Sequence, residues 1–240
     1  MLTTEGCLLD GRVRYAQPAD GYRTGIEPVL LAASVPARAG HRVLEAGTGA
    51  GAGLLCLAVR VPGVLGLGIE IDPAMAELAR QNIAANNIAG LSVVTVDIGA
   101  WRGDGAFDHA FGNPPWHDSA GTPSPTARRR LATHEGELRI EGWIASLHAA
   151  LRPGGSLTLI VPAGQIGRAM TGLQTAGFGR LTLLPLWPKP GRDAKLVMVQ
   201  GCAGRRDPDR LTPGLVLHDA DGRFSAEADS LLRDGAALTF

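Results

Sequence analysis

Residues 43–53 read VLEAGTGAGAG, an apolar run that ends in glycines at alternate positions. The apolar residues predict a β-strand, and the Leu and Ala residues that follow Gly53 predict a helix. Glycine lets the backbone turn tightly and lets a ligand approach without a Cβ in its way. The start of the following helix offers N–H groups that have no partner within the helix. This stretch therefore predicts a strand, a ligand-binding loop and a helix in succession.

Strand-like and helical patterns alternate between about residues 41 and 161. Helical stretches separate the strands, and in one of them Asp72 is placed as the N-cap and Pro73 as the first helical residue. This alternation predicts a parallel sheet covered by helices on both faces. Two later runs, Arg180–Leu186 and Lys195–Gly201, predict a pair of strands joined by a basic loop. The five earlier candidate strands are Arg42–Ala46, Leu65–Glu70, Leu91–Asp97, Phe107–Asn113 and Ser156–Val161.

Four of these five strands have a polar residue at or next to their last position, namely Glu45, Glu70, Asp97 and Asn113. In open α/β sheets, ligands bind in the crevice outside the carboxyl ends of the strands. Any single strand could simply end at a polar surface. Four polar ends together favour a binding site at this edge of the sheet.

The glycine loop also fits the loose dinucleotide pattern G-x-G-x-x-A through Gly47, Gly49 and Ala52. Glu70 follows about 20 residues later and suits a ribose, because a carboxylate can accept hydrogen bonds from two hydroxyl groups. These features predict a cofactor that contains adenosine. They do not by themselves separate S-adenosylmethionine from NAD.

Glu45 bears on that choice. A carboxylate before the glycines suits the sulfonium and ammonium groups of S-adenosylmethionine better than the two phosphates of NAD. The alternative is that Glu45 pairs with a nearby arginine, such as Arg42 or Arg23. The residue type alone favours neither interpretation.

The stretch Asn113-Pro114-Pro115-Trp116 follows the fourth strand. An asparagine side chain offers both a donor and an acceptor. Each proline fixes φ and removes an N–H, which leaves a stiff loop with free carbonyl groups. Tryptophan provides a broad face for stacking. The four residues therefore predict a clamp for a flat group, either a nucleobase with an exocyclic amine or a glutamine side chain.

Composition limits the class of protein. Of the 240 residues, 45% are hydrophobic and 19% are charged, as in an ordinary globular protein. The formal net charge is zero, so RNA binding would need a local basic patch. Three widely separated cysteines fit neither a disulfide framework nor a metal site and favour a reducing compartment. The sequence has no signal-peptide pattern, no apolar stretch of about 18 residues and no metal-ligand spacing of histidines, so we expect a cytoplasmic protein without membrane segment or metal.

Taken together, these motifs resemble those of class I S-adenosylmethionine-dependent methyltransferases over about residues 10 to 204. The Asn-Pro-Pro-aromatic stretch is similar to that of members that methylate nitrogen, on adenine, guanine or glutamine. The flanking stretches, from Leu9 to Ala32 and from Gly121 to Arg129, are similar to the bacterial tRNA (adenine-N6) methyltransferase group. The resemblance implies a Rossmann-like α/β fold, with a seven-stranded, mostly parallel sheet whose last strand is antiparallel and with helices on both faces.

The resemblance also implies roles for single residues. Three glycines would pass under the methionine part of S-adenosylmethionine, Glu45 would lie near its amine, Glu70 would bind the ribose, and Asp97, with Ile98 beside it, would receive the adenine. The expected cofactor-binding residues are Glu45, Gly47, Gly49, Gly51, Glu70, Asp97 and Ile98. The expected catalytic residues are Asn113, Pro114, Pro115 and Trp116, and candidate substrate-binding residues are Tyr22, Arg23 and Lys189.

We therefore expect three regions: an N-terminal cap segment (1–40), the methyltransferase domain (41–204) and a C-terminal extension (205–240) packed on it. The expected reaction is methylation of an exocyclic amine, with adenine N6 of tRNA as the expected substrate. One alternative is a protein glutamine-N5 methyltransferase, which the neutral net charge keeps open. The other is an NAD-dependent oxidoreductase or a nucleotide-binding module, which would leave Asn113 to Trp116 without a role.

Overall fold

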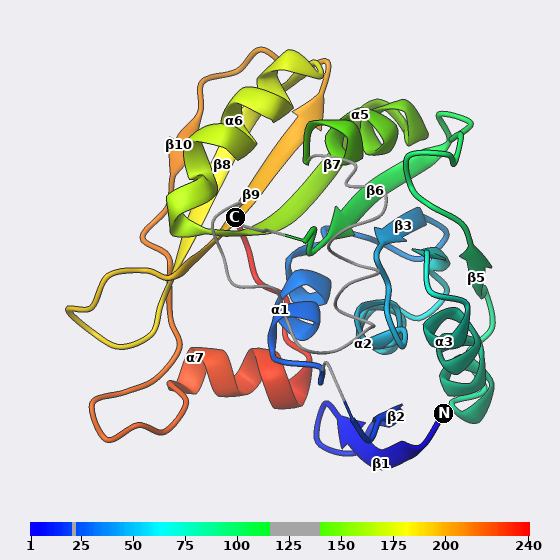
Figure 1. The fold of residues 1–240 in the computed structure, drawn as a ribbon. Helices are drawn as coiled ribbons and strands as arrows, with labels where there is room; N and C mark the ends of the chain where they lie inside the picture. The colour runs from blue at the N-terminus through cyan, green and yellow to red at the C-terminus, as the bar shows by residue number, and fades with distance from the viewer. Residues whose placement is uncertain (21–22, 116–139) are drawn as a thin grey trace.

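In the computed structural model, which describes residues 1–20, 23–115 and 140–240, a mixed β-sheet runs through the centre of the molecule (Figure 1). Its principal strands are β3 (Arg42–Ala46), β4 (Leu65–Glu70), β5 (Leu91–Thr95), β6 (Phe107–Gly112), β7 (Leu151–Pro162), β8 (Phe178–Trp187) and β9 (Leu196–Ala203). The helices are α1 (Glu27–Ser34), α2 (Ala52–Arg60), α3 (Pro73–Ala85), α5 (Ile140–Ala150), α6 (Ile166–Thr175) and α7 (Ala226–Asp229).

The order of these seven strands across the sheet is β8-β9-β7-β6-β3-β4-β5. All neighbours run parallel except β9, which is antiparallel to both β7 and β8. The predicted mostly parallel arrangement of these seven strands, with the last one antiparallel, is therefore confirmed, although two further short strands bring the sheet to nine. Two short strands that the sequence analysis did not predict, β10 (Arg210–Leu211) and β11 (Leu215–Val216), both pair with the outer edge of β8.

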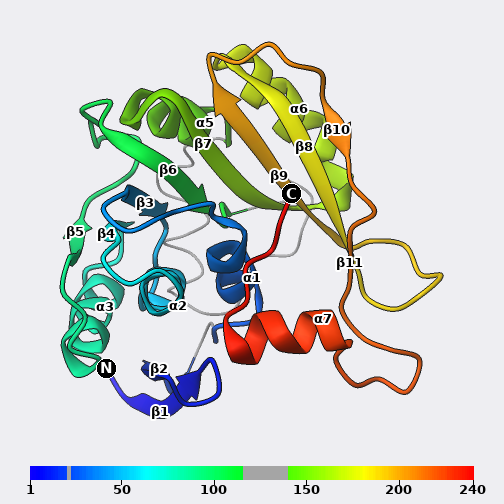
Figure 2. The ribbon, with the colours of Figure 1, turned by 180° about the vertical axis from the view of Figure 1, so that it is seen from behind.

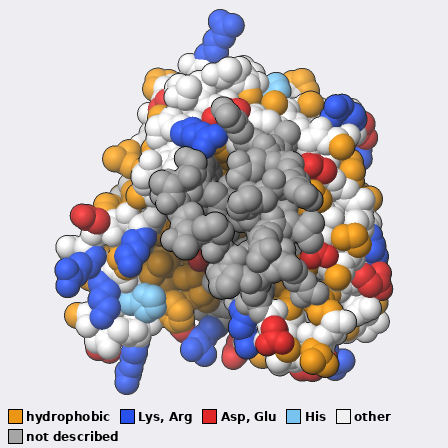
Figure 3. All heavy atoms as spheres, in the orientation of Figure 1, with side chains coloured by type: hydrophobic (Ala, Val, Ile, Leu, Met, Phe, Trp, Pro, Cys, Tyr) orange, Lys and Arg blue, Asp and Glu red, His pale blue; other side chains and the backbone are white. Residues whose placement is uncertain are grey.

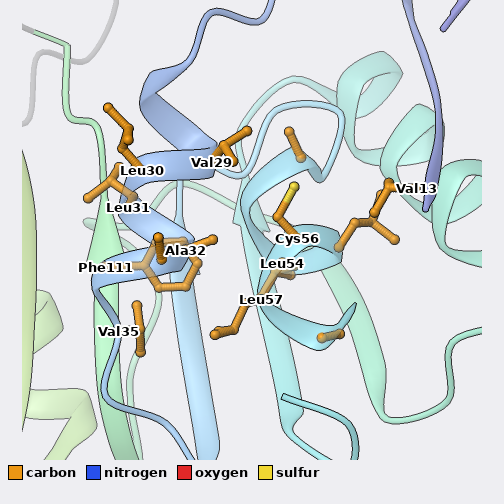
Figure 4. Packing of buried hydrophobic residues seen from close by; sticks show 14 of the residues in the cluster. Val13, Val29, Leu30, Leu31, Ala32, Val35, Leu54, Cys56, Leu57 and Phe111 are labelled. Atoms are coloured by element: carbon orange, nitrogen blue, oxygen red, sulfur yellow. The ribbon is translucent and has the colours of Figure 1, made fainter. Parts of the chain in front are cut away.

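Apolar side chains form one core on each face of the sheet, as Figures 1 and 2 show for the helices that cover it. Helices α1, α2 and α3 pack on one face, and α5 and α6 pack on the other. On the first face, Phe111 of β6 is fully buried beside Leu31 and Val35 of the α1 region and Leu57 of α2 (Figure 4). The sheet is thus covered on both faces, which leaves the edge formed by its strand ends for ligand binding.

The strand bounds agree closely with the sequence patterns in the centre of the sheet and less well elsewhere. Strands β3 and β4 have the predicted bounds, whereas β5 ends at Thr95, two residues before Asp97. Strand β7 begins at Leu151, five residues earlier than predicted, because a register shift opposite residues 107–109 of β6 accommodates a Pro-Gly-Gly stretch. At α3, Asp72 caps the helix as predicted, since its side chain accepts the N–H of Ala74 at 2.8 Å.

The two ends of the chain add to this sheet domain. Strands β1 (Thr3–Leu8) and β2 (Val13–Pro18) form a separate antiparallel hairpin. At the other end, α7 and the short π-helix Ser230–Asp234 pack near α1, and Leu238 donates its N–H to the carbonyl of Ala33 at 2.9 Å. The division into three regions stays a prediction.

A histidine pair lies at the amino edge of the sheet, away from the predicted site. His41 Nδ1 is 3.1 Å from His109 Nε2, and His109 Nδ1 is 2.8 Å from the hydroxyl of Ser156. Burial, together with the neighbouring His41, lowers the pKa of His109 to about 4, against the opposing effect of Asp108. His109 is therefore neutral in the folded protein near pH 7.

We expect this histidine to make the protein sensitive to acid. A lowered pKa means that the unfolded chain binds a proton first, so stability is full above about pH 6.5 and falls as the pH drops toward 4. The loss from His109 should be on the order of 3 kcal/mol. Urea titrations at a series of pH values measure it, and His109→Asn should flatten the profile in this window. Parallel profiles for the two proteins would rule out His109 as the cause.

Candidate active site

Glu45, the penultimate residue of β3, is 4% exposed and lies under the glycine loop. Its Oε2 accepts the hydroxyl of Thr48 at 2.5 Å and the N–H of Leu54, in the first turn of α2, at 3.1 Å. Burial raises the pKa of Glu45 to about 8, although the hydrogen bonds from Thr48 and Leu54 oppose the rise. A Cβ at Gly53 would overlap Oε1, so glycine is required where α2 begins.

The alternative pairing of Glu45 with Arg42 is wrong. The guanidinium of Arg42 forms an ion pair with Asp104 at 3.3 Å, and its backbone N–H donates to Asp108 at 2.8 Å. Within the described ranges, none of the ion pairs involves Glu45 or Glu70. The two carboxyl groups therefore present acidic character without a cationic side chain to neutralise it.

Glu70 ends β4 and is 9% exposed. Its Oε2 accepts the N–H of Gly49 at 2.8 Å, and its Oε1 accepts the N–H of Asp72 at 2.9 Å. Burial raises the pKa of Glu70, and these backbone hydrogen bonds oppose the rise. Each carboxylate oxygen has a second lone pair, so Glu70 can still accept two hydroxyl groups. This capacity fits a ribose diol.

The glycine loop is a sharp turn that only glycine can form easily. Gly47, Gly49 and Gly51 have φ values of 66°, 56° and 88°, all in the left-handed region. At Gly47 a Cβ would also lie 2.9 Å from the ring of Trp143, on α5. The N–H groups of Gly47 and Thr48 both donate to the carbonyl of Ile69, which ties the loop to β4.

The other two predicted strand ends lie at the same edge of the sheet. Asp97 is half-buried in a turn beyond β5, where its Oδ1 accepts the N–H of Gly99 at 2.8 Å, and Ile98 beside it is buried. Asn113 directly follows β6 and is exposed. Because Ala46 pairs with Gly112, Asn113 emerges next to the start of the glycine loop.

The remaining predicted catalytic and substrate-binding residues are spread over several segments of the chain, and two of them lie outside the described residues. In the clamp, Pro114 is buried and Pro115 is exposed, while Trp116 lies outside the described residues, as does Tyr22. Arg23 is exposed and precedes Thr24, whose N–H and hydroxyl bond to side chains of β2. Lys189 is exposed on the β8–β9 loop, also at the carboxyl edge of the sheet.

Asn82 is a contributor that the sequence analysis missed. It lies on α3, is 3% exposed, and uses its amide to bond both the N–H and the carbonyl of Ala16 on β2, each at 2.9 Å. The same amide donates to the carbonyl of Ala50 in the glycine loop at 2.9 Å. One side chain therefore joins the N-terminal hairpin to the loop. The available signal was an asparagine beside Leu78, Ala79 and Ile83 on an apolar helix face.

Within the residues that the structure describes, no three His, Cys, Asp or Glu side chains are grouped to hold a metal ion. In the same part of the chain, no helix is long and apolar enough to cross a membrane. The site is instead a glycine cradle flanked by carboxylates, which fits a cationic ligand that carries a ribose.

Residues 26–171 match the methyltransferase small domain family. The chain belongs to this family. Among curated relatives, the tRNA1(Val) (adenine(37)-N6)-methyltransferase of Porphyromonas gingivalis is 31% identical over 221 residues, which cover 85% of both chains. The protein of the same name from Tolumonas auensis is 29% identical and covers 85% of this chain and 86% of its own.

Solved structures of methyltransferases share the fold. A predicted O-methyltransferase from Agrobacterium tumefaciens superposes with a TM-score of 0.74 at 25% identity, over 89% of this chain and 98% of its own. Phosphoethanolamine N-methyltransferase 2 of Haemonchus contortus, in complex with S-adenosyl-L-methionine, superposes with a TM-score of 0.54 at 12% identity, over 71% and 50% of the two chains. The chain is an S-adenosylmethionine-dependent methyltransferase, and the oxidoreductase alternative is wrong.

Asn82 and Asn86 provide a matched pair of mutations in this methyltransferase. Asn86 bonds the N–H and carbonyl of Arg14 on β2 at 2.8 and 2.7 Å and donates to the carbonyl of Asn82 at 2.7 Å, but among the described residues it forms no hydrogen bond with the glycine loop. Asn82→Ala should lose roughly 1–3 kcal/mol of stability, because buried backbone groups lose their partner, and Asn86→Ala should lose less, because water can replace its exposed bonds to Arg14. Only Asn82→Ala should also weaken S-adenosylmethionine binding, by about five- to tenfold, because the Ala50 carbonyl is released. Calorimetry on the two folded variants measures this, and equal affinities would contradict it.

Proposed function

We propose that this methyltransferase methylates N6 of an adenine in tRNA. The observation that carries the proposal is the position of Asn113 and Pro114, which emerge from β6 beside the glycine loop. The names of the curated relatives, tRNA1(Val) (adenine(37)-N6)-methyltransferases, support adenine in tRNA as the acceptor. The neutral net charge of the chain does not oppose it, because a local patch can hold RNA.

We assign the cofactor contacts as follows. When bound, S-adenosylmethionine supplies an electrophilic methyl group on a cationic sulfur. Glu70 would accept the ribose hydroxyls with its two remaining lone pairs, Asp97 would accept the amino group of the cofactor's adenine, and Ile98 would provide an apolar surface for the ring. Gly47, Gly49 and Gly51 keep side chains out of the space under the methionine part. Glu45 would ionise when the ligand binds and would then supply negative charge beneath the loop, toward the methionine amine.

Asn113 and Pro114 act on the adenine amine. This amine is a poor nucleophile, since its lone pair is delocalised into the ring. The side-chain oxygen of Asn113 and the carbonyl of Pro114 each accept one N–H, which favours a pyramidal nitrogen and aims its lone pair at the methyl group. Trp116, outside the described residues, is assigned to stack on the ring. Catalysis is then mainly positioning, which contributes roughly 7–11 kcal/mol in well-oriented reactions.

The target base must first leave its stack, which costs a few kcal/mol. Stacking on an aromatic side chain offsets about 1–3 kcal/mol of that cost. No general base is needed at Asn113, because the amine loses its proton after the methyl group has been transferred. The two accepting oxygens therefore serve to orient the amine.

A glutamine-N5 methyltransferase is the second candidate, which the neutral net charge keeps open. A glutamine amide is also flat and presents the same N–H groups to Asn113 and Pro114. The two candidates differ in the acceptor and share the chemistry of the clamp. Incubation with labelled S-adenosylmethionine and either bulk tRNA or a release factor distinguishes them by which one gains the label.

Asn113→Ala should lower kcat by about two to three orders of magnitude, as removal of one preorganised polar group does in other enzymes. Affinity for S-adenosylmethionine should stay within about twofold, because Asn113 contacts the acceptor only. Asn113→Asp keeps the accepting oxygens and should retain more activity than alanine. Radiolabel transfer to tRNA and calorimetry provide the two readouts. Full turnover by Asn113→Ala would remove this residue from the mechanism.

Glu45 should release a proton when S-adenosylmethionine binds. Its raised pKa of about 8 leaves it protonated at pH 7, and a nearby cation favours the ionised form. Affinity should therefore increase as the pH is raised from 6 to 8. Calorimetry at pH 7 in two buffers of different ionisation enthalpy measures the proton release.

Glu45→Gln is the control for this measurement. The ligand's own ammonium group, with a pKa of about 7.7–8.0, titrates equally in both proteins and cancels in the comparison. The Gln variant should bind with less proton release and a weaker pH dependence. The same proton release from both proteins would show that Glu45 does not respond to the ligand.

A further inference from the structure

The β8–β9 loop, residues 188–195, lies at the same edge of the sheet as Asn113. Strand β9 is antiparallel to both β7 and β8, so β8 runs in the direction of β6 and β7 and ends at the same edge. Three strand spacings, roughly 14 Å in total, separate the ends of β6 and β8. A nucleic-acid strand advances about 3.4 Å per nucleotide, so this distance corresponds to about four nucleotides.

This loop carries exposed positive charge. Lys189, Arg192 and Lys195 are exposed, and Asp193 is the one acidic residue among residues 188–195. In the described parts of the chain, none of the three cations pairs with a carboxylate, and Lys189 Nζ donates to the backbone carbonyl of Ala220 at 3.4 Å. Figure 3 shows Lys and Arg side chains gathered around an apolar hollow in the part of the surface where Figure 1 draws this loop.

The C-terminal extension holds the base of this loop. Strand β11 pairs with the end of β8, and the N–H of Leu217 donates to the carbonyl of Trp187 at 2.7 Å. The N–H of His218 then donates to the carbonyl of Pro188 at 3.2 Å, and the indole N–H of Trp187 donates to Pro213 at 3.0 Å. A loop anchored in this way loses less conformational entropy when a ligand binds to it.

We propose that Lys189, Arg192 and Lys195, braced by residues 213–220, form a basic ridge that binds phosphates of the RNA substrate outside the base pocket. The proposal rests on the proposed function, because it takes RNA as the acceptor. It gives the C-terminal extension a role in holding the ridge in place. It also explains how a chain without net charge holds a polyanion: the positive charge is placed at the edge where the base enters.

Two double variants test the ridge against a control of equal charge. Arg192→Ala/Lys195→Ala removes two cations of the ridge. Arg205→Ala/Arg206→Ala removes two exposed cations that follow β9 at the opposite edge of the sheet. Binding of unmodified bulk tRNA is measured by fluorescence anisotropy over a range of salt concentrations, together with kcat and KM for methyl transfer and the affinity for S-adenosylmethionine.

The ridge variant should bind tRNA about tenfold more weakly and lower the magnitude of the salt slope by about two, roughly one per lost phosphate contact. Its KM for tRNA should rise by a similar factor with kcat unchanged, because the lost contacts act equally in the ground and transition states. The control variant should match the wild type, and all three proteins should bind S-adenosylmethionine equally.

Equal losses in both double variants would overturn the ridge, because they would trace the effect to net charge. Wild-type affinity and KM in the ridge variant, with tRNA still methylated, would also overturn the ridge and leave the proposed function intact. If the wild-type protein labels a release factor and no tRNA, the proposed function fails, and the ridge fails with it.

Discussion

The site depends on two carboxyl groups, Glu45 and Glu70, buried at the ends of adjacent parallel strands. Burial of a carboxyl group is costly unless hydrogen bonds replace those that it makes with water. Here the donors come from the glycine loop, from its threonine and from the starts of α2 and α3. The loop and the acids therefore stabilise each other: the left-handed turns aim N–H groups at the carboxylates, and the carboxylates hold those turns in place.

The centre of the fold was predictable because each signal there is local and strong. The bounds of β3 and β4 follow from short, mainly apolar stretches between turn residues, and the start of α3 follows from Asp72 and Pro73. The strand order also places polar strand ends at one edge in any fold of this class. The gathering of Glu45, Glu70, Asp97 and Asn113 at that edge is therefore a consequence of topology that sequence reasoning can reach.

Features that depend on contacts between distant parts of the chain were not predictable in this way. The hydrogen bond from Asn82 to Ala50 joins residues 32 positions apart. Helix periodicity predicts that Asn82 lies on the buried face but does not predict which groups it bonds. The ion pair of Arg42 with Asp104 was not predictable either, since Glu45 is much closer to Arg42 in the sequence than Asp104 is. The early start of β7 requires a register shift against β6, which only the paired strand reveals.

The shared amide of Asn82 has a thermodynamic consequence. One side chain forms hydrogen bonds with both the backbone of β2 and a carbonyl of the glycine loop. The attachment of the hairpin and the shape of the glycine loop are therefore parts of one cooperative unit. Coupling between two equilibria is reciprocal and equal in size. Attachment of the hairpin through Asn82 favours cofactor binding by a certain free energy. Cofactor binding therefore protects the backbone amides of β2 from hydrogen exchange by the same free energy. Hydrogen exchange in the first 18 residues therefore reports whether the cofactor is bound at the strand ends of the sheet.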